Sequence, residues 1–223
     1  MKRTILFLII ISCMAFQPQN DRLETQSTIK QVFELAKAGY DNMDAKSLIK
    51  AAKILIDNPE IRVIKTQDEV DEYEPSQDES VLDSHNFFNT TELLKDAKKF
   101  APYDAKLLHW RIEQLKKRLK DYKEMSLTYN KIKVKNYLVY GNNSKTISME
   151  FDKNKKVSMS VRIGNDLQLK VSDTTAKKAV GKSKFIGDAR LLSFTSESDG
   201  SYKITIENTS DKANDCYLMI ETR

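Results

Sequence analysis

Residues 192–206 read LSFTSESDGSYKITI, and this stretch sets the fold class of the C-terminal half. Apolar and polar residues alternate on both sides of Asp199-Gly200. A period of two is the pattern of a half-buried strand. Asp-Gly between two such runs is a strong local signal for a β-hairpin. The stretch therefore predicts two antiparallel strands joined by a tight turn.

The same alternation recurs along residues 130–223. Further alternating runs cover residues 147–151, 157–163, 167–171 and 216–220, with a shorter apolar segment at 137–140. Polar or glycine-containing turns separate them at 152–156, 164–166 and 208–214. About seven short strands at this spacing predict antiparallel sheets, most simply a β-sandwich domain over residues 130–223.

The preceding segment, residues 22–125, has the helical period instead. Four groups of apolar residues fall on one helical face each, at 29–40, 48–56, 93–101 and 108–122. Asp44 and Asn89 are suitable N-caps, Glu92 is a capping partner for Asn89, and Pro102 ends the third helix. The expected fold class is α+β in two segregated parts, a bundle of about four helices followed by the sandwich. The period changes near residues 124–131, so we expect two separable domains.

An acidic segment lies between the second and third predicted helices. Ten carboxylates fall between Asp57 and Asp83. Like charge and few large apolar residues predict a mobile, solvated loop over residues 66–86. Calcium binding by this loop stays open, although the spacing of a known calcium loop is absent.

The N-terminus has the layout of a secretory signal. Lys2 and Arg3 precede the apolar run 5–11, and a polar stretch follows from Gln17. The run is too short to span a bilayer. We expect residues 1–15 to be a signal peptide and the protein to be exported, whether periplasmic, outer-membrane-associated or secreted. Lipidation at Cys13 and ordinary cleavage both fit.

Removal of the signal leaves Cys216 as a single cysteine, so no disulfide forms within the mature chain. Its apolar neighbours predict a buried side chain. Residues 126–223 carry 17 basic and 11 acidic residues, a net charge of +6. The lysines are spread over every predicted strand and are not interleaved with aromatic residues, so we expect no nucleic-acid partner.

The segment from Gly200 to Asn208, followed by residues 217–220, resembles the closing strands of bacterial pre-peptidase C-terminal-type β-sandwich domains. The resemblance covers about the last 35 residues and implies a non-catalytic module that accompanies secreted proteins. The acidic stretch found earlier in such domains is absent, so no ion site is carried over. The whole chain also resembles uncharacterised exported proteins of Bacteroides- and Flavobacterium-type bacteria.

No catalytic, cofactor or metal motif is evident. The two histidines, His85 and His109, do not have the spacing of a zinc site, and Cys216 has no histidine near it in sequence. Gly181-Lys182-Ser183 lacks the preceding glycine of a phosphate loop. We therefore expect no cofactor and no metal. For catalysis, the absence of these motifs favours a protein without enzyme activity over an enzyme.

Three functions fit the sequence. The leading interpretation is an exported, non-catalytic envelope or secreted protein whose sandwich binds a protein or glycan. The alternatives are a hydrolase using carboxylates such as Asp71 or Glu74 where the two domains meet, and a structural subunit of an envelope assembly. Facing carboxylates in a cleft favour the hydrolase, whereas accessible aromatic side chains favour binding.

Overall fold

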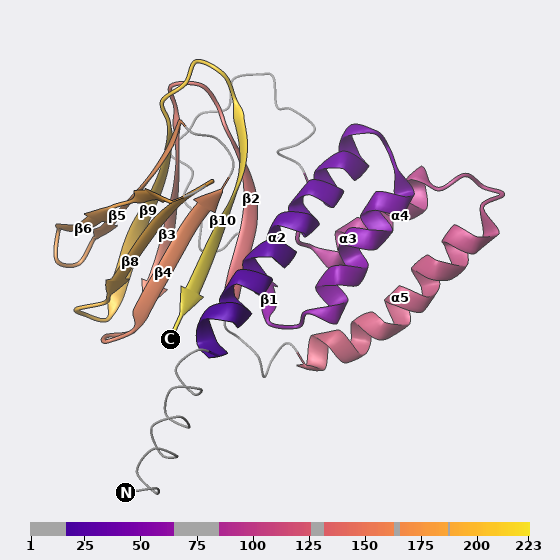
Figure 1. Ribbon diagram of the computed structural model, residues 1–223, viewed down its shortest axis with the longest axis horizontal. Coiled ribbons are helices and arrows are strands. Elements are labelled where there is room, and N and C mark those ends of the chain that lie inside the picture. The colour runs from indigo at the N-terminus through magenta and orange to yellow at the C-terminus, as the bar shows by residue number, and fades with distance from the viewer. Residues whose placement is uncertain (1–16, 65–84, 126–131, 163–165, 187) are drawn as a thin grey trace, which may run out of the picture.

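The computed structural model describes residues 17–64, 85–125, 132–162, 166–186 and 188–223. These residues form three layers, in which helices cover one face of a six-stranded sheet and a four-stranded sheet covers the other (Figure 1). The fold is α+β, with the helices before the main sheets in the chain, as predicted.

Four helices make up the helical layer of the described residues. They are α2 (Gln17–Asp41), α3 (Ala45–Asp57), α4 (Thr90–Phe100) and α5 (Lys106–Met125). Asp44 caps α3 by accepting the backbone N–H groups of Lys46 and Ser47, and Asn89 caps α4 in the same way. The described side chains of the predicted apolar faces lie in one shared core, with Phe100 and Leu108 only partly buried. Only Glu92 differs, because its carboxylate accepts the N–H of Asn86 rather than that of Asn89.

The strands form two sheets. The six-stranded sheet has, in order, β1 (Ile61–Val63), β2 (Ile132–Val139), β10 (Asn214–Thr222), β4 (Lys156–Arg162), β8 (Ala189–Thr195) and β7 (Lys184–Ile186). The four-stranded sheet has β3 (Ser144–Phe151), β9 (Gly200–Asn208), β5 (Leu167–Asp173) and β6 (Lys178–Lys182). Neighbours are antiparallel except β1 and β2, which are parallel.

The predicted hairpin at Asp199-Gly200 is wrong. Strand β8 belongs to the six-stranded sheet and β9 to the four-stranded sheet, so this connection passes from one sheet to the other. A two-residue type I′ turn needs a positive φ at both central residues. Gly200 has a φ of 157°, but Asp199 is not among the described residues with positive φ. The turn predicted at residues 152–156 also joins strands of different sheets, β3 and β4.

Strands β1, β6 and β7 were not predicted. Strand β1 comes from the helical half and extends the edge of the sheet, with Ile61 opposite Ile132 and Val63 opposite Val134. Strands β6 and β7 form the two true hairpins, β5–β6 and β7–β8. The sequence gives them little alternation, because residues 174–187 are mostly lysine, threonine and small residues.

Two cores lie on opposite faces of the six-stranded sheet, and β10 contributes to both. Tyr217 and Met219 belong to the core shared with the helices. Cys216, Leu218 and Ile220 belong to the core between the sheets. All five side chains are buried. The two predicted halves of the chain therefore meet along an apolar surface.

Several predictions lie outside the described residues. They are the signal peptide at residues 1–15 with Cys13, the acidic loop except for His85 and Asn86, and most of the boundary at 124–131. Within the described part of the chain, no helix has the length and apolar character needed to span a membrane.

Candidate functional site

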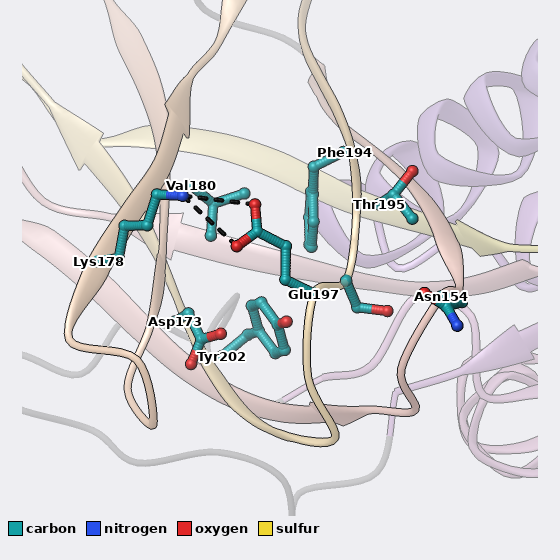
Figure 2. A pocket seen from close by; sticks show the side chains of 9 residues that line it. Asn154, Asp173, Lys178, Val180, Phe194, Thr195, Glu197 and Tyr202 are labelled. Carbon is teal, nitrogen blue, oxygen red and sulfur yellow. Dashed lines mark hydrogen bonds and ion pairs between the residues drawn. The ribbon is translucent and has the colours of Figure 1, made fainter.

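A pocket of about 370 Å³ lies where the two sheets of the sandwich separate. It is lined by residues from five places in the chain: the β3–β4 turn, the end of β5, β6, the end of β8 with the β8–β9 connection, and β9 (Figure 2). The lining residues are Asn154, Asp173, Lys178, Val180, Phe194, Thr195, Ser196, Glu197 and Tyr202. Its volume is in the range of small-ligand sites.

An aromatic cluster forms the apolar side of the pocket. Phe194 lies 5.5 Å from Tyr202 and 6.1 Å from Phe151, centroid to centroid, and Phe151 and Tyr202 are 5.4 Å apart. Tyr202 and Phe151 are buried, whereas Phe194 is only half-buried. Phe194 also lines a second pocket of about 350 Å³, together with Ser158, Ser193 and Arg223 among others. The two pockets thus share Phe194 and Thr195, and the Phe194 ring packs with the core between the sheets.

Asp173 ends β5 and is held by the turn that follows. Its carboxylate accepts hydrogen bonds from the backbone N–H groups of Ala176 (2.9 Å) and Thr175 (2.8 Å) and from the Ser198 hydroxyl (3.1 Å). These bonds, that of Ala176 foremost, hold the pKa of Asp173 below its usual range, against the opposing effect of burial. Asp173 is therefore an ionised carboxylate whose main role is to fix the turn.

An ion pair spans the mouth of the pocket. Lys178 Nζ lies 3.4 Å from Glu197 Oε1, and dashed lines mark the pair in Figure 2. Both side chains are well exposed, so solvent screens their attraction and either can turn to a ligand at small cost. The pair supplies one positive and one negative group beside the Phe194 ring.

Ser196 fixes the side of the pocket formed by the β3–β4 turn. Its hydroxyl is fully buried, donates to the carbonyl of Asp152 and accepts the N–H of Lys155 at 2.9 Å. The carbonyl of Ser196 accepts the N–H of Asn154 at 2.8 Å. Asn154 has a φ of 64°, in the left-handed region that asparagine tolerates. The amide of Asn154 is thereby placed on a rigid turn at the pocket edge (Figure 2).

A wider groove of about 1030 Å³ lies at one end of the helical layer. It is formed by the α2–α3 and α4–α5 connections and the start of α5. Met43 and Leu107 line it, and Trp110 lies one helical turn beyond Leu107 on α5. All three side chains are more than half exposed. Exposed apolar side chains gathered in this way are typical of contact surfaces.

The residues singled out from the sequence lie elsewhere. Cys216 is fully buried, and burial, with the Asp215 charge, raises the pKa of its thiol, so it is no nucleophile in the folded protein. His109 is on α5, with Nε2 3.0 Å from the carbonyl of Pro102. Asp71 and Glu74 lie outside the described residues. His85, in contrast, lies against Glu92 and Asp96, a grouping the sequence analysis did not predict.

The sequence carried little signal for the pocket. Its lining residues span positions 154 to 202 and come from both sheets. The available clue was Phe194 followed by Ser196 and Glu197, an aromatic residue at a strand end beside a polar connection. That clue could not be used without knowing that β8 and β9 belong to different sheets.

The fold and the pocket define a β-sandwich with an added helical layer. No family model matches the chain, and no curated protein does. The similar solved structures cover about two fifths of the chain. The pre-peptidase C-terminal domain of a Bacillus anthracis collagenase is 11% identical, covering 40% of this chain and 87% of that domain, with a TM-score of 0.36.

Two further structures have the same partial similarity. A periplasmic inhibitor of g-type lysozyme from Aeromonas hydrophila is 14% identical over 42% of this chain and 87% of its own, with a TM-score of 0.34. A carbohydrate-binding module in complex with calcium and xylotriose is 20% identical over 39% of this chain and 78% of its own, with a TM-score of 0.27. The neighbours thus include the family that the C-terminal strands resemble, at low identity.

Proposed function

We propose that this chain is an exported, non-catalytic binding protein whose sandwich pocket takes a saccharide. The observation that carries the proposal is the half-buried Phe194 ring, which packs against Tyr202 and lies among the polar groups that line the sandwich pocket. A sugar presents C–H groups on its ring faces and hydroxyls around its edge. An aromatic wall with amide, carboxylate and ammonium groups beside it matches both.

The polar groups of the pocket differ in how many hydrogen bonds and ion pairs they already make within the protein. Asp173 accepts two hydrogen bonds from its own turn and one from Ser198 in the β8–β9 connection. Glu197 and Lys178 are paired only with each other among the described residues. Asn154 offers an amide on a fixed turn. Glu197, Lys178 and Asn154 are therefore the side chains we expect to bind sugar hydroxyls.

The electrostatics of the pocket argue against a glycoside hydrolase at this site. Such enzymes need two carboxyl groups, one of them protonated by a raised pKa. The pocket does hold two carboxylates, Asp173 and Glu197. The pKa of Asp173 is lowered, however, so Asp173 is not the general acid. Glu197 is exposed and paired with Lys178, so it lacks the apolar surroundings of a general acid. We infer that the pocket binds its ligand without cleaving it.

Affinity for defined oligosaccharides, measured by calorimetry after a glycan-array screen, tests the proposal. Phe194→Ala should weaken binding about tenfold or more, a loss of about 1.4 kcal/mol. Glu197→Gln removes a charge from an exposed side chain, so it tests the polar rim without disturbing the core. Phe185→Ala is the matched control, because Phe185 is an exposed aromatic on β7 outside both pockets. Binding that all three variants retain, or no saccharide binding at all, would contradict the proposal.

Export is the other part of the proposal and rests on the sequence of residues 1–17. The expected mature chain lacks residues 1 to about 15 or carries a lipid on Cys13. Mass spectrometry of the protein from the envelope fraction of its native host distinguishes the two. A mature envelope pool that still begins at Met1 would contradict export by this signal.

A protein partner is the second candidate, and the groove beside Met43, Leu107 and Trp110 favours it. Trp110 is the one tryptophan of the chain, so its fluorescence reports on this surface alone. A blue shift of its emission on adding a purified partner indicates that the partner covers the groove. Unchanged emission during binding would place the partner elsewhere.

A further inference from the structure

Three side chains capable of holding a metal meet beside the N-terminus of α4. His85 Nδ1 lies 3.4 Å from Glu92 Oε1 and 3.5 Å from Asp96 Oδ2. The three ligand atoms all lie within 4.8 Å of one another. Asp96 is buried, and His85 and Glu92 are half-buried. The group is therefore enclosed and combines one imidazole nitrogen with two carboxylates.

The spacing of His85 Nδ1 from each of the two carboxylates matches that of neighbouring ligands in a metal coordination sphere. Zinc binds nitrogen and oxygen ligands at about 2.0–2.2 Å, so neighbouring ligand atoms in a tetrahedron lie about 3.3–3.6 Å apart. Both distances from His85 Nδ1 fall in that interval.

The negative charge of Glu92 and Asp96 also favours a bound cation. Two carboxylates are placed side by side, one of them almost fully buried. Among the described residues, Lys99 is the one lysine or arginine that pairs with either, and it reaches the other oxygen, Oδ1, of Asp96 at 3.0 Å. The Oδ2 side, which faces His85, is left without a permanent positive charge. Buried like charges are costly unless a cation or a proton compensates them.

A second layer of contacts holds the three residues in place. The Tyr40 hydroxyl donates to Asp96 Oδ2 at 3.2 Å, and the Tyr40 ring stacks on His85 with centroids 4.2 Å apart. The N–H of Asn86 donates to Glu92 Oε1 at 3.2 Å. The Asn136 side-chain amide on β2 donates to the His85 carbonyl and accepts the N–H of Phe87. Outer contacts of this kind orient the ligands in metal sites.

We infer that His85, Glu92 and Asp96 bind a divalent transition-metal ion, best matched by Zn²⁺, with water completing the coordination. The ion would fasten the segment before α4 to that helix, and Tyr40 would link it to α2. Imidazole with carboxylate suits zinc and its neighbours in the transition series better than calcium. The site is independent of the sandwich pocket, so it does not depend on the proposed saccharide binding.

The test is metal binding by the chelator-treated full-length protein. Zn²⁺ should bind with one-to-one stoichiometry in calorimetry and raise the melting temperature. Co²⁺ in its place should give the intense visible absorption of a tetrahedral site. His85→Ala should abolish both signals. His109→Ala is the matched control, because it removes the other histidine of the chain and should leave both unchanged.

Two more measurements make the outcome decisive. Tyr40→Phe keeps the stacking ring but removes the hydrogen bond to Asp96, so Zn²⁺ affinity should fall about tenfold. Ca²⁺ should neither bind tightly nor displace Zn²⁺. If Zn²⁺ binds equally well to His85→Ala, or not at all to a well-folded parent protein, the inference is wrong. The three residues are then a histidine–carboxylate ion-pair network.

Discussion

The two faces of strand β10 are both buried, but they are built from different parts of the chain. On the sandwich face, Leu218 and its neighbours pack almost entirely against other strands, and Ile64 is the one member of that core from the helical half. On the helix face, Tyr217 packs against Phe33 of α2 and Phe88 before α4, with ring centroids 5.1 and 6.0 Å apart. The sandwich core is thus built almost entirely by the C-terminal half, whereas the core on the helix face is built by both halves.

This difference bears on whether the two halves are separable domains. Removing the helices leaves the core between the sheets nearly complete but exposes Val134, Tyr217 and Met219. It also removes β1 from the edge of the sheet. Separability therefore depends on whether the sandwich tolerates an uncovered outer face.

The largest expected effect comes from deleting the helical half. A fragment covering residues 128–223 should give a β-type circular dichroism spectrum and a cooperative melt, because its inner core is intact. Its melting temperature should be lower than that of the whole chain by about 10 °C or more, since the outer core is lost. Tyr217→Thr with Met219→Thr should improve its solubility by making the uncovered face polar.

A molten or insoluble fragment, in both versions, together with a single transition of the whole chain, would contradict separability. The two halves would then share one cooperative core.

Single truncations on the two faces of β10 form a matched pair. Leu218→Ala and Met219→Ala each remove a buried side chain from neighbouring positions, and each should cost about 2–5 kcal/mol in the whole chain. In the fragment, Leu218→Ala should cost as much as before, whereas Met219→Ala should cost little, because Met219 is already uncovered. Urea titrations of the four variants and of their two parents, the whole chain and the fragment, give the comparison. An equal loss from Met219→Ala in the fragment would mean that this face packs on something other than the helices.

Most of the strands and the helices of the described residues could be predicted from the sequence, but the pairing of the strands could not. Alternation located the strands from β2 to β5 and from β8 to β10, and helical spacing located all four helices. Asp199-Gly200 was misread because the local signal for a turn does not report which sheet the next strand joins. The residues that decide this, such as Ser196 bonded to the β3–β4 turn, act over 41 positions or more in sequence.

One informative signal was overlooked. Residues 216–220, CYLMI, form an unbroken apolar run, and a strand with no polar face is buried on both sides. Reading only Cys216, Leu218 and Ile220 gave the sandwich face and ignored Tyr217 and Met219. The complete run predicts that another layer covers the sheet. The candidate metal group gave no such signal, because the approach of His85 to α4 depends on Asn136 of a distant strand.

A smaller loss of stability is expected when a helix cap is removed and the buried side chains are left unchanged. Asp44→Ala removes the cap of α3 and should cost about 1 kcal/mol, and Asn89→Ala should do the same at α4. Their pH dependence should differ. The hydrogen bond from the Ser47 hydroxyl, followed by those of the Lys46 and Ser47 N–H groups, lowers the pKa of Asp44.

A lowered folded-state pKa means that the Asp44 contribution is complete above the unfolded-state pKa of about 3.9 and is lost as the pH falls through the folded-state value. The gap between the parent protein and Asp44→Ala should therefore begin to close as the pH falls below about 4. The gap for Asn89→Ala should stay constant, because an amide does not titrate. Denaturation at a series of pH values measures both, and a gap for Asp44→Ala that persists at low pH would contradict the role of its charge.

The smallest expected effect concerns the rate at which a thiol reagent labels Cys216, which lies on the sandwich face of β10. We expect this rate to be unchanged by Asp44→Ala. In a Cys13→Ser chain Cys216 is the one thiol, and burial raises its pKa and shields it from reagents. Labelling by a thiol reagent then requires the inner core to open.

Asp44→Ala loosens the helix side but leaves β10 on its sandwich side intact, so it should not speed labelling in the native buffer if the halves open independently. Leu218→Ala, which adjoins the thiol, should speed it strongly and is the positive control. If Asp44→Ala accelerated labelling by the factor that its loss of stability predicts, about fivefold for 1 kcal/mol, opening of the helices and opening of the sandwich would be a single event.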